Sequence, residues 1–559
     1  MTSNNPLIVQ SDMTLLLEVD NPLFEEARDA LASFAEIIKS PEHIHTYRVT
    51  PLSLWNAASA RVDQETIINT LHKYSRFEVP DNLLVEIREQ ISRYGLLRIE
   101  PFDNETLMLT SEDPTLLTQL LHTETIKDLA TIRKDERSLL FPTINRGLIK
   151  QALVKIGYPA IDLAGYRTGD TLEFTLSSAT KKGEVFNLRD YQVNAIEAFY
   201  RGGSIYGGNG VIVLPCGAGK TMVGLGVMHK LKTQTLILTT SIVATRQWRD
   251  ELLDKTDLPE DALGEYSGEI KQIRPITLAS YQILTHRKSK GEDFSHFYLF
   301  NQRNWGLIIY DEVHLLPAQV FRFTASLQAV RRLGLTATLV REDGREDDVF
   351  SLIGPKCFDV PWKELEKRGW IAQAECYEIR VKIDSSLRLE YASAENRQRF
   401  RIASENPRKH RIAKHLIERH KGESILVIGQ YLRQLEGIAA ELNAPLITGK
   451  TPVHERERIY SEFREGRIGL IIVSSVANFA LDLPEASVAI QISGRFGSRQ
   501  EEAQRLGRIL RPKMDGRSAM FYSLVTHSTE EQDFALHRQL FLTEQGYSYT
   551  ILTEDRLSV

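Results

Sequence analysis

The segment of this chain that first points to chemistry is LPCGAGKT, residues 214–221. Its last two residues, Lys220 and Thr221, are the types that hold phosphate oxygens and a magnesium ion in phosphate-binding loops. The strict loop pattern, G-x-x-x-x-G-K-[ST], has a glycine where this chain has Leu214. Two interpretations are therefore open: a nucleotide site, or a turn that binds no ligand.

The surroundings of the loop favour a nucleotide site. An apolar run precedes the loop, and a stretch typical of a helix, MVGLGVMHKL, follows it. In such a setting glycines allow backbone N–H groups to converge on phosphate oxygens, and the helix N-terminus attracts the anion. We expect the following residues to contact the nucleotide: Pro215, Cys216, Gly217, Ala218, Gly219, Lys220 and Thr221.

Two adjacent acids supply the second part of a hydrolytic site. They follow an apolar run in LIIYDEVH, residues 307–314. Asp311, at the end of the expected strand, is placed to bind magnesium through water, and Glu312 can orient and deprotonate an attacking water. An acidic helix cap is the alternative, but a cap does not require an apolar strand that leads into both carboxylates. Together, the loop and the acid pair predict nucleotide hydrolysis.

A third candidate element, EEAQRLGRILRP at residues 501–512, lies far downstream. Arg508 and Arg511 are three residues apart on the expected helix and share a face. Arginines from another domain can neutralise the charge that develops on a transferred phosphate. A solvated basic helix is the alternative, but the segment has no acid between Glu502 and Asp515, which favours the phosphate role.

The elements that must position these residues alternate along the chain. From about residue 205, short β-branched runs alternate with helical stretches, as in parallel sheets covered by helices. The expected strands of a first unit lie within residues 210–215, 235–240, 275–280, 306–314 and 332–338. Residues 361–423 are polar and helical in pattern. Strands resume within residues 424–429, 445–449, 470–475, 488–493 and 519–525.

The first 170 residues show a different sequence pattern. Residues 21–38 and 64–77 show helical periodicity, and residues 94–111 predict a hairpin that turns at Asp103-Asn104. No motif with catalytic spacing lies there, so we expect an accessory or partner-binding module.

The composition excludes several classes of protein. The 559 residues are 42% hydrophobic and 26% charged, and no apolar run reaches the roughly 18 residues that a membrane helix needs. The N-terminus lacks the basic region of a secretory signal. Cys216, Cys357 and Cys376 form no metal pattern or disulfide framework, which favours a reducing, cytoplasmic setting. The net charge of −5 means that nucleic acid can bind only through a local groove.

The ordered motifs resemble those of the superfamily 2 helicase motors. The set comprises LPCGAGKT, TTSIVATRQW, TLASYQIL, DEVH, LTAT, FALDLPEASVAIQIS and QRLGRILR. Loops of that superfamily commonly lack the first glycine, which accounts for Leu214. Within it the chain is similar to the XPB family of DNA helicases, which act in nucleotide excision repair and transcription initiation. The similarity rests on LTATLVRED (335–343), LIGPK (352–356), LPEASVAIQIS (483–493) and GSRQEEAQRLGRILR (497–511), and extends forward through IHTYRVTPLSLWNAAS and YGLLRIEP.

The resemblance implies roles for residues in the ATP site. Gln192, in LRDYQVNAI, matches the glutamine that reads the adenine, with Arg189 as a weaker neighbour. Thr221 and Asp311 are implied to bind the magnesium ion. The second motor domain is implied to complete the site through Asp482, Gln504, Arg508 and Arg511. The residues implied to couple ATP to DNA, or to open it, are His314, Thr336, Thr338 and the element Arg341-Glu342-Asp343.

The resemblance also implies an architecture. We expect a multidomain α/β protein with two RecA-like parallel-sheet motor domains, an N-terminal α+β accessory region and a helical thumb insert. The expected boundaries are 1–97 for an accessory domain, 98–170 for a damage-recognition-like domain, 171–362 for the first motor domain, 363–422 for a linker and thumb-like insert, and 423–559 for the second motor domain. Eukaryotic members carry long terminal extensions that this chain lacks, so we expect a bacterial or archaeal form.

Contacts with DNA are expected from two basic segments. Residues 395–421 hold nine Lys or Arg and three acids, with Phe400 interleaved to stack on a base or to pack. Whether this stretch binds phosphates or is a solvated helix face stays open. The expected contacts are Arg397, Arg399, Arg401 and, from the TRQW motif, Arg246, whereas Trp248 is expected in the core.

The leading hypothesis is an ATP-driven helicase or translocase that acts on duplex, forked or single-stranded DNA, with 3′-5′ polarity implied by the family. A protein partner such as a nuclease or repair factor is also implied, and no membrane. An RNA helicase and a DNA-binding scaffold with a vestigial ATPase are the rival hypotheses. The complete acid pair and both arginines argue against the scaffold.

Overall fold

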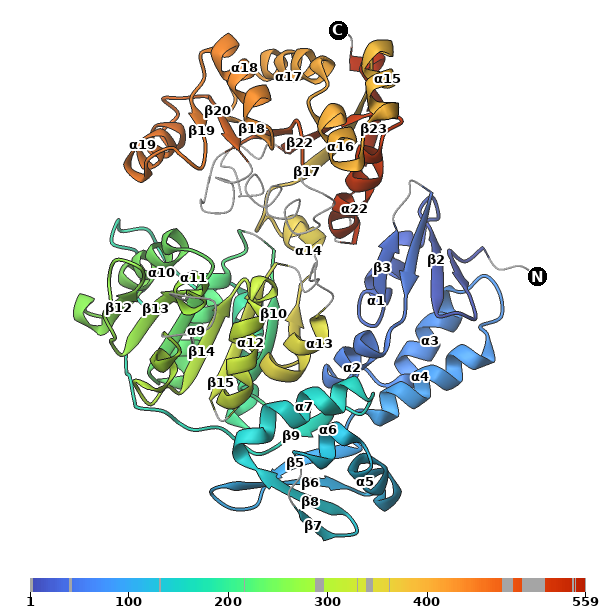
Figure 1. Cartoon of the computed structure of the whole chain (residues 1–559), viewed down its shortest axis with the longest axis vertical. Helices are drawn as coiled ribbons and strands as arrows, with labels where there is room; N and C mark the ends of the chain where they lie inside the picture. Colours follow the sequence, from blue (N-terminus) through green and yellow to red (C-terminus); the bar gives the residue numbers. More distant parts are fainter. Residues whose placement is uncertain are drawn as a thin grey trace. The chain divides into compact units, whose positions relative to one another are not determined.

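The computed structural model describes residues 4–39, 43–129, 132–215, 217–286, 296–328, 330–337, 345–360, 362–474, 486–494, 518–544, 547 and 549–557. The chain divides into two compact units, formed by most of residues 1–360 and most of residues 361–559 (Figure 1). None of the helices in these ranges is long and apolar enough to cross a membrane.

The N-terminal segment forms a four-stranded sheet and four helices. The strands are β1 (Leu7–Val9), β2 (Thr14–Glu18), β3 (Glu36–Lys39) and β4 (Ile44–Arg48), in the order β1-β2-β4-β3. The helices are α1 (Phe24–Leu31), α2 (Pro51–Ser59), α3 (Gln64–Tyr74) and α4 (Asp81–Arg93). The prediction of a helix over residues 21–38 is wrong at its end, because the β-branched Ile37 and Ile38 enter strand β3. The helix expected over residues 64–77 is confirmed as α3.

The next segment is a five-stranded sheet in the order β7-β8-β6-β5-β9. Its strands are β5 (Leu97–Pro101), β6 (Thr106–Ser111), β7 (Ile132–Asp135), β8 (Ser138–Pro142) and β9 (Ala160–Asp162), with helices α5 (Pro114–Leu121), α6 (Glu124–Lys127) and α7 (Arg146–Lys155). The expected hairpin is confirmed: β5 and β6 pair antiparallel. The carboxylate of Asp103 accepts the backbone N–H groups of Glu105 and Thr106, which stabilises the turn.

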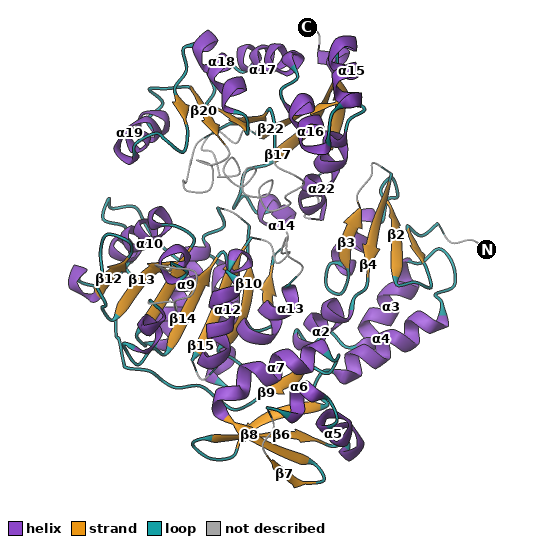
Figure 2. Cartoon of the chain, in the orientation of Figure 1, coloured by secondary structure: helices purple, strands orange, loops and turns teal. Residues whose placement is uncertain are grey.

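The first parallel sheet has the order β12-β13-β11-β14-β15-β10-β16. Its strands are β10 (Asn209–Val213), β11 (Thr235–Thr239), β12 (Leu263–Tyr266), β13 (Ile276–Ser280), β14 (Leu307–Asp311), β15 (Arg331–Thr336) and β16 (Lys356–Asp359), and the five predicted among them are confirmed. The accompanying helices are α8 (Asp190–Tyr200), α9 (Lys220–Leu231), α10 (Ile242–Lys255), α11 (Tyr281–Leu284), α12 (Ala318–Thr324) and α13 (Glu346–Asp348). Helices α9 and α10 lie against the sheet (Figure 2).

The order of the central strands decides where the site forms. Strand β15 lies between β10 and β14, and all three run parallel. Parallel strands end at the same edge of a sheet, so the segments that follow β10, β14 and β15 come together there. The glycine-containing loop follows β10 and the acid pair closes β14, which brings both predicted parts of the site to one edge.

The second unit holds another parallel sheet, in the order β19-β20-β18-β21-β22-β17-β23. Its strands are β17 (Ala374–Val381), β18 (Ile425–Gly429), β19 (Leu446–Ile447), β20 (Leu470–Ser474), β21 (Val488–Gln491), β22 (Ala519–Thr526) and β23 (Tyr549–Thr553). The accompanying helices are α14 (Trp362–Lys367), α15 (Ser385–Ser393), α16 (Asn396–Ser404), α17 (Pro407–Arg419), α18 (Leu432–Leu442), α19 (Val453–Arg464) and α22 (Glu530–Glu544). The five strands predicted here are confirmed.

The stretch expected to be helical, residues 361–423, differs from the prediction in two ways. Strand β17 runs through it and pairs with β22 and β23, because Cys376, Ile379 and Val381 are apolar and buried in the sheet. Helix α17 buries Ile412 in the core of the same sheet. These parts of the stretch therefore belong to the parallel sheet and its core rather than to a separate helical insert.

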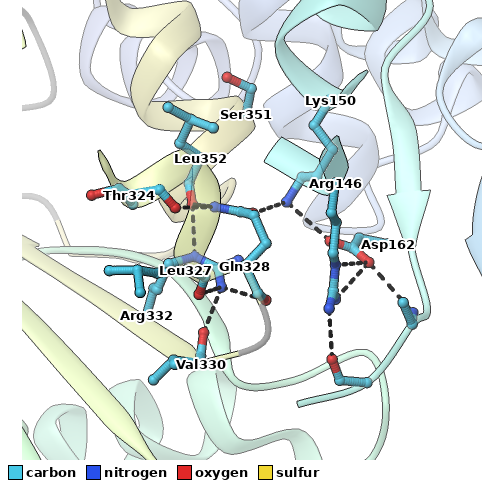
Figure 3. A network of polar contacts seen from close by, with 12 residues as sticks. Arg146, Lys150, Asp162, Thr324, Leu327, Gln328, Val330, Arg332, Ser351 and Leu352 are labelled. Carbon is cyan, nitrogen blue, oxygen red and sulfur yellow. Dashed lines mark hydrogen bonds and ion pairs between the residues drawn. The ribbon is translucent and has the colours of Figure 1, made fainter. Parts of the chain in front are cut away.

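A buried network of polar side chains joins α7 and β9 to the first parallel sheet (Figure 3). Asp162 accepts a hydrogen bond from Arg146 (Nη2 to Oδ1, 2.7 Å) and lies 3.1 Å from the Nζ of Lys150. Lys150 also donates to Oε1 of Gln328 (3.0 Å), whose backbone carbonyl accepts from Nη1 of Arg332 (2.8 Å). We refer to Arg146, Lys150, Asp162, Gln328 and Arg332 as the Asp162 cluster.

Candidate active site

The glycine-containing loop connects the end of β10 to the start of α9. Leu214 is fully buried, and its backbone N–H donates to the carbonyl of Thr336 (2.9 Å), so this residue extends the strand. Gly217 and Gly219 both have φ near +80°, a conformation that favours glycine. A Cβ on Gly219 would lie 2.5 Å from Nε2 of Gln192. The leucine in the glycine position is therefore compatible with the loop, whereas the two glycines inside the loop are required.

Gln192, which is predicted to read the adenine, lies against this loop. Its role in binding adenine stays a prediction. Gln192 belongs to the first turn of α8 and is buried. Its Oε1 accepts the backbone N–H of Arg189 (2.9 Å), which orients the amide. The guanidinium of Arg189 donates to the hydroxyl of Tyr191 (3.1 Å).

Charged and polar side chains from α9, from the end of β14 and the residues after it, and from β15 meet at one edge of the first parallel sheet. Lys220, at the start of α9, lies 3.2 Å from Oε1 of Glu312, and Oε2 of Glu312 lies 3.5 Å from Nδ1 of His314. A hydrogen bond of 2.6 Å joins His314 to the hydroxyl of Thr336, the last residue of β15. We refer to Lys220, Asp311, Glu312, His314 and Thr336 as the Lys220 cluster.

The pKa values of the two carboxylates in the Lys220 cluster are shifted in opposite directions. Burial and the neighbouring charge of Glu312 raise the pKa of Asp311 to about 6. Burial alone would raise the pKa of Glu312 as well, but the ammonium of Lys220 and the ring of His314 lower it below its usual value. At neutral pH both acids are therefore ionised beside one ammonium, and this surplus of negative charge attracts a cation.

The residues present fit a nucleotide with its magnesium ion. Magnesium is usually held by one or two carboxylates together with substrate phosphates, and Asp311 offers such a carboxylate. Thr221 follows Lys220 in the first turn of α9, where backbone N–H groups face an incoming anion. The absence of a side chain at Gly219 lets the amide of Gln192 approach the loop closely, since a Cβ would collide with it. Bound magnesium would supply neutralisation of charge on the phosphate oxygens.

Part of the predicted site lies outside the described residues. These residues are Cys216 in the loop, Thr338, Arg341, Glu342 and Asp343 after β15, and Asp482, Gln504, Arg508 and Arg511 in the second unit. Their roles stay predictions.

The expected DNA contact in α10 is available at the surface. The side chain of Arg246 is 44% exposed and lies 3.6 Å from carboxylate oxygens of both Glu265 and Glu269. These acids compete with a phosphate for the guanidinium, so a contact with DNA has to displace them.

Five of the Lys and Arg side chains described in the basic stretch 395–421 pair with acids: Arg399, Arg401, Arg408, Lys409 and Lys414. Arg399 lies 3.6 Å from Glu530, and Arg401 donates to Glu405 (2.6 Å). Phe400 is buried against Phe534, so it packs rather than stacking on a base. The side chain of Arg397 lies outside the described residues. This pairing favours the interpretation of the stretch as a solvated helix face.

The sequence did not reveal which side chains hold Asp311. Trp248 was expected in the core, and it is buried, but it also donates its indole N–H to Oδ2 of Asp311 (2.8 Å). The hydroxyl of Tyr281 donates to the backbone carbonyl of Asp311 (2.8 Å). A buried tryptophan usually finds an acceptor for its N–H, which was the available signal, but the acceptor is distant in the chain.

Three family models match the chain. The model described as ERCC3/RAD25/XPB C-terminal helicase matches residues 365–558. The model described as Type III restriction enzyme, res subunit, matches residues 185–341, and one described as Helicase conserved C-terminal domain matches residues 7–135.

Curated relatives match over almost the whole chain. A protein of Kineococcus radiotolerans named DNA 3′-5′ helicase XPB is 53% identical over 99% of this chain and 97% of its own length. One of Mycobacterium tuberculosis with the same name is 53% identical over 99% of both chains. The Saccharomyces cerevisiae general transcription and DNA repair factor IIH helicase/translocase subunit XPB/SSL2 is 31% identical over 99% of this chain and 72% of its own. Among solved structures, a putative HsdR fragment of a type I restriction enzyme from Vibrio vulnificus aligns with a TM-score of 0.48 at 20% identity, covering 66% of this chain and 69% of that one.

Proposed function

The chain belongs to the XPB family of DNA 3′-5′ helicases, and we propose that it is an ATP-driven motor that opens duplex DNA or moves along it during DNA repair. The observation that carries the proposal is the meeting of Lys220, Asp311 and Glu312 at one edge of the first parallel sheet. A phosphate-binding lysine beside an acid pair at strand ends is the arrangement that nucleotide hydrolysis requires.

In the proposed mechanism Lys220 changes partner when ATP binds. Its ammonium lies 3.2 Å from Glu312 and keeps the pKa of that carboxyl low, which makes Glu312 a weak base. The β- and γ-phosphates of ATP are the stronger partner for the ammonium. Once Lys220 binds them, Glu312 loses its counter-charge and becomes more basic. Glu312 then orients a water molecule and accepts its proton as the water attacks the γ-phosphate, and the bond to the bridging oxygen breaks, so that ADP and inorganic phosphate are released.

The remaining roles extend this mechanism. Thr221 and Asp311 would hold the magnesium ion, and Gln192 would read the adenine. His314 and Thr336 connect the acid pair to the end of β15, and we propose that this link makes hydrolysis respond to DNA. The second unit would complete the site through Asp482, Gln504, Arg508 and Arg511. The DNA is proposed to be duplex, forked or single-stranded, and a nuclease or repair factor is the proposed protein partner.

The proposal is tested by unwinding of forked DNA duplexes that carry a 3′ or a 5′ tail, with ATP turnover measured in parallel. We expect ATP-dependent strand separation that favours the 3′ tail and a turnover that DNA stimulates more than RNA. Lys220→Ala should abolish both activities. The matched control is Lys230→Ala, because this lysine lies on the same helix but pairs with the exposed Glu197. Wild-type turnover in the Lys220→Ala variant would contradict the site, and equal stimulation by RNA would contradict the DNA assignment.

A further inference from the structure

Trp248 lies between the helix that follows the loop and the strand that carries the acid pair. It belongs to α10, and its ring edge packs on α9 at Gly224, where a Cβ would come within 2.5 Å of the indole Cη2. Gly224 is three residues after Thr221, so both share one face of α9. From there the indole reaches β14 and donates its N–H to Oδ2 of Asp311 (2.8 Å). One side chain thus spans the elements that hold both proposed magnesium ligands.

The hydrogen bonds around Asp311 fix its carboxylate in one orientation. Oδ2 accepts from Trp248, and Oδ1 accepts from the backbone N–H of Glu312 (3.1 Å). The Tyr281 hydroxyl holds the backbone carbonyl of the same residue. Each carboxylate oxygen can accept two hydrogen bonds, so both oxygens keep capacity for a water or a cation. Two donors on opposite oxygens resist rotation of the group, which removes an ordering cost when a ligand binds.

We propose that Trp248 is a positioning residue for magnesium: its indole N–H orients the Asp311 carboxylate, and its ring sets the spacing between α9 and β14. The inference rests on the proposed function, because it assumes that Asp311 holds the magnesium of a nucleotide. A purely structural tryptophan would need only to fill the core. The inference therefore predicts that the N–H matters separately from the ring.

The test compares Trp248→Phe, which keeps an aromatic ring but removes the N–H, with Trp305→Phe. Trp305 is a matched control because it is also fully buried in the first unit, and its N–H donates to the carbonyl of Leu299 (3.1 Å), away from Asp311. The measured quantity is the affinity for a fluorescent ADP analogue in EDTA and in magnesium, without turnover. The gain in affinity that magnesium brings should fall about tenfold in Trp248→Phe, as expected for a lost hydrogen bond to a charged group. The affinity in EDTA should not change, and Trp305→Phe should keep the full gain.

A second variant covers the case in which Trp248→Phe does not fold. Gly224→Ala retains the indole but pushes its ring with a new Cβ, and we expect the same loss of the magnesium-dependent gain. A wild-type gain in Trp248→Phe or, if that variant does not fold, in a folded Gly224→Ala overturns the inference, as does an equal loss in Trp305→Phe. A wild-type protein whose ADP affinity ignores magnesium would contradict the proposed function itself, which separates the two failures.

Discussion

Two clusters of buried charge in the first unit differ in the sign of their net charge and in how far groups of the protein satisfy that charge. The Lys220 cluster has two carboxylates beside one ammonium, and its Lys220 and Glu312 side chains are 12% and 19% exposed. The Asp162 cluster has three cations around one carboxylate, and the side chains of Arg146, Lys150 and Asp162 are at most 7% exposed. One cluster lies at the carboxyl ends of the strands, and the other joins two parts of the unit.

The Asp162 cluster satisfies its charges with groups of the protein itself. Burial would raise the pKa of Asp162, but Arg146 and Lys150 hold it far below its usual value. Arg332 donates to the backbone carbonyls of Leu352 (2.7 Å) and Gln328 (2.8 Å), so dipoles take the place of further carboxylates. Such a network tolerates burial because each of its three cations donates to at least one acceptor within the protein.

The Lys220 cluster keeps an unresolved repulsion between neighbouring acids. The pKa of Asp311 is raised to about 6 by burial and by Glu312, so the ionised pair is destabilised until a cation arrives. Buried charge therefore has two uses in the first unit. Buried cations that the protein holds with a carboxylate and with carbonyl oxygens join parts of the unit, whereas adjacent carboxylates that repel each other prepare a site for a cation.

The largest expected effect comes from removing the surplus charge. Glu312→Gln should reduce ATP turnover by about 10²- to 10⁴-fold, because it removes the proposed base. Stability should change little, since relief of the repulsion at Asp311 offsets the lost pairing of Glu312 with Lys220. Steady-state ATPase assays and urea denaturation measure the two effects, with Glu260→Gln as a control on an exposed glutamate. A turnover that stays close to wild type would show that Glu312 is not the base.

Removing the carboxylate of the Asp162 cluster should have the opposite effects: a loss of stability with little change in ATP turnover. Asp162→Asn leaves three buried cations without a counter-charge, and breaking a buried pair costs about 3–5 kcal/mol of unfolding free energy. ATP turnover of the folded variant should remain near wild type. Urea denaturation checks this, with Glu112→Gln as the control, because Glu112 forms an exposed ion pair with Arg137. An unchanged free energy of unfolding in Asp162→Asn would contradict a stabilising role for the Asp162 cluster.

A pH effect of up to about 3 kcal/mol should distinguish Lys150 from its neighbours. Burial is the largest influence on its pKa, which is lowered from 10.5 to about 8. Between about pH 8 and 10.5 the unfolded chain binds the proton more tightly, so stability rises with pH there. The stability of the wild type relative to Lys150→Met should increase over this range by up to about 3 kcal/mol, since one pKa unit corresponds to about 1.4 kcal/mol. Denaturation at several pH values measures the difference, and a flat difference contradicts the prediction.

The smallest expected effect concerns the link between His314 and Thr336. Thr336→Val removes a buried hydrogen bond worth about 1 kcal/mol, and we expect the stimulation of ATP turnover by DNA to fall about fivefold. Thr324→Val is the matched control, because its buried hydroxyl bonds to the hydroxyl of Tyr310 and the carbonyl of Val320 rather than to a side chain of the Lys220 cluster. Equal losses in the two variants would mean that the link has no role in coupling.

Much of the fold was predictable because the signals are local. Ten predicted strands form the core of the two parallel sheets, and the hairpin at Asp103 is confirmed. Strand β17 was missed because its polar neighbours give the stretch a helical appearance, and its place in the sheet depends on pairing with β22 and β23. The basic stretch was ambiguous for a related reason: the acids that pair with Arg399 and Arg408, Glu530 and Glu554, lie far away in the sequence.

The residue types of the site can be recognised in the sequence alone: a lysine after two glycines, and an acid pair at the end of an apolar run. Those follow from short-range pattern and from the chemistry that phosphate and magnesium demand. Which buried donor holds Asp311, and which amide accepts from Lys150, depends on the tertiary structure. Trp248 and Asp311 are 63 residues apart, and Lys150 and Gln328 are 178 apart. Such pairs form because strand order and helix packing bring the side chains together, and no local pattern records that.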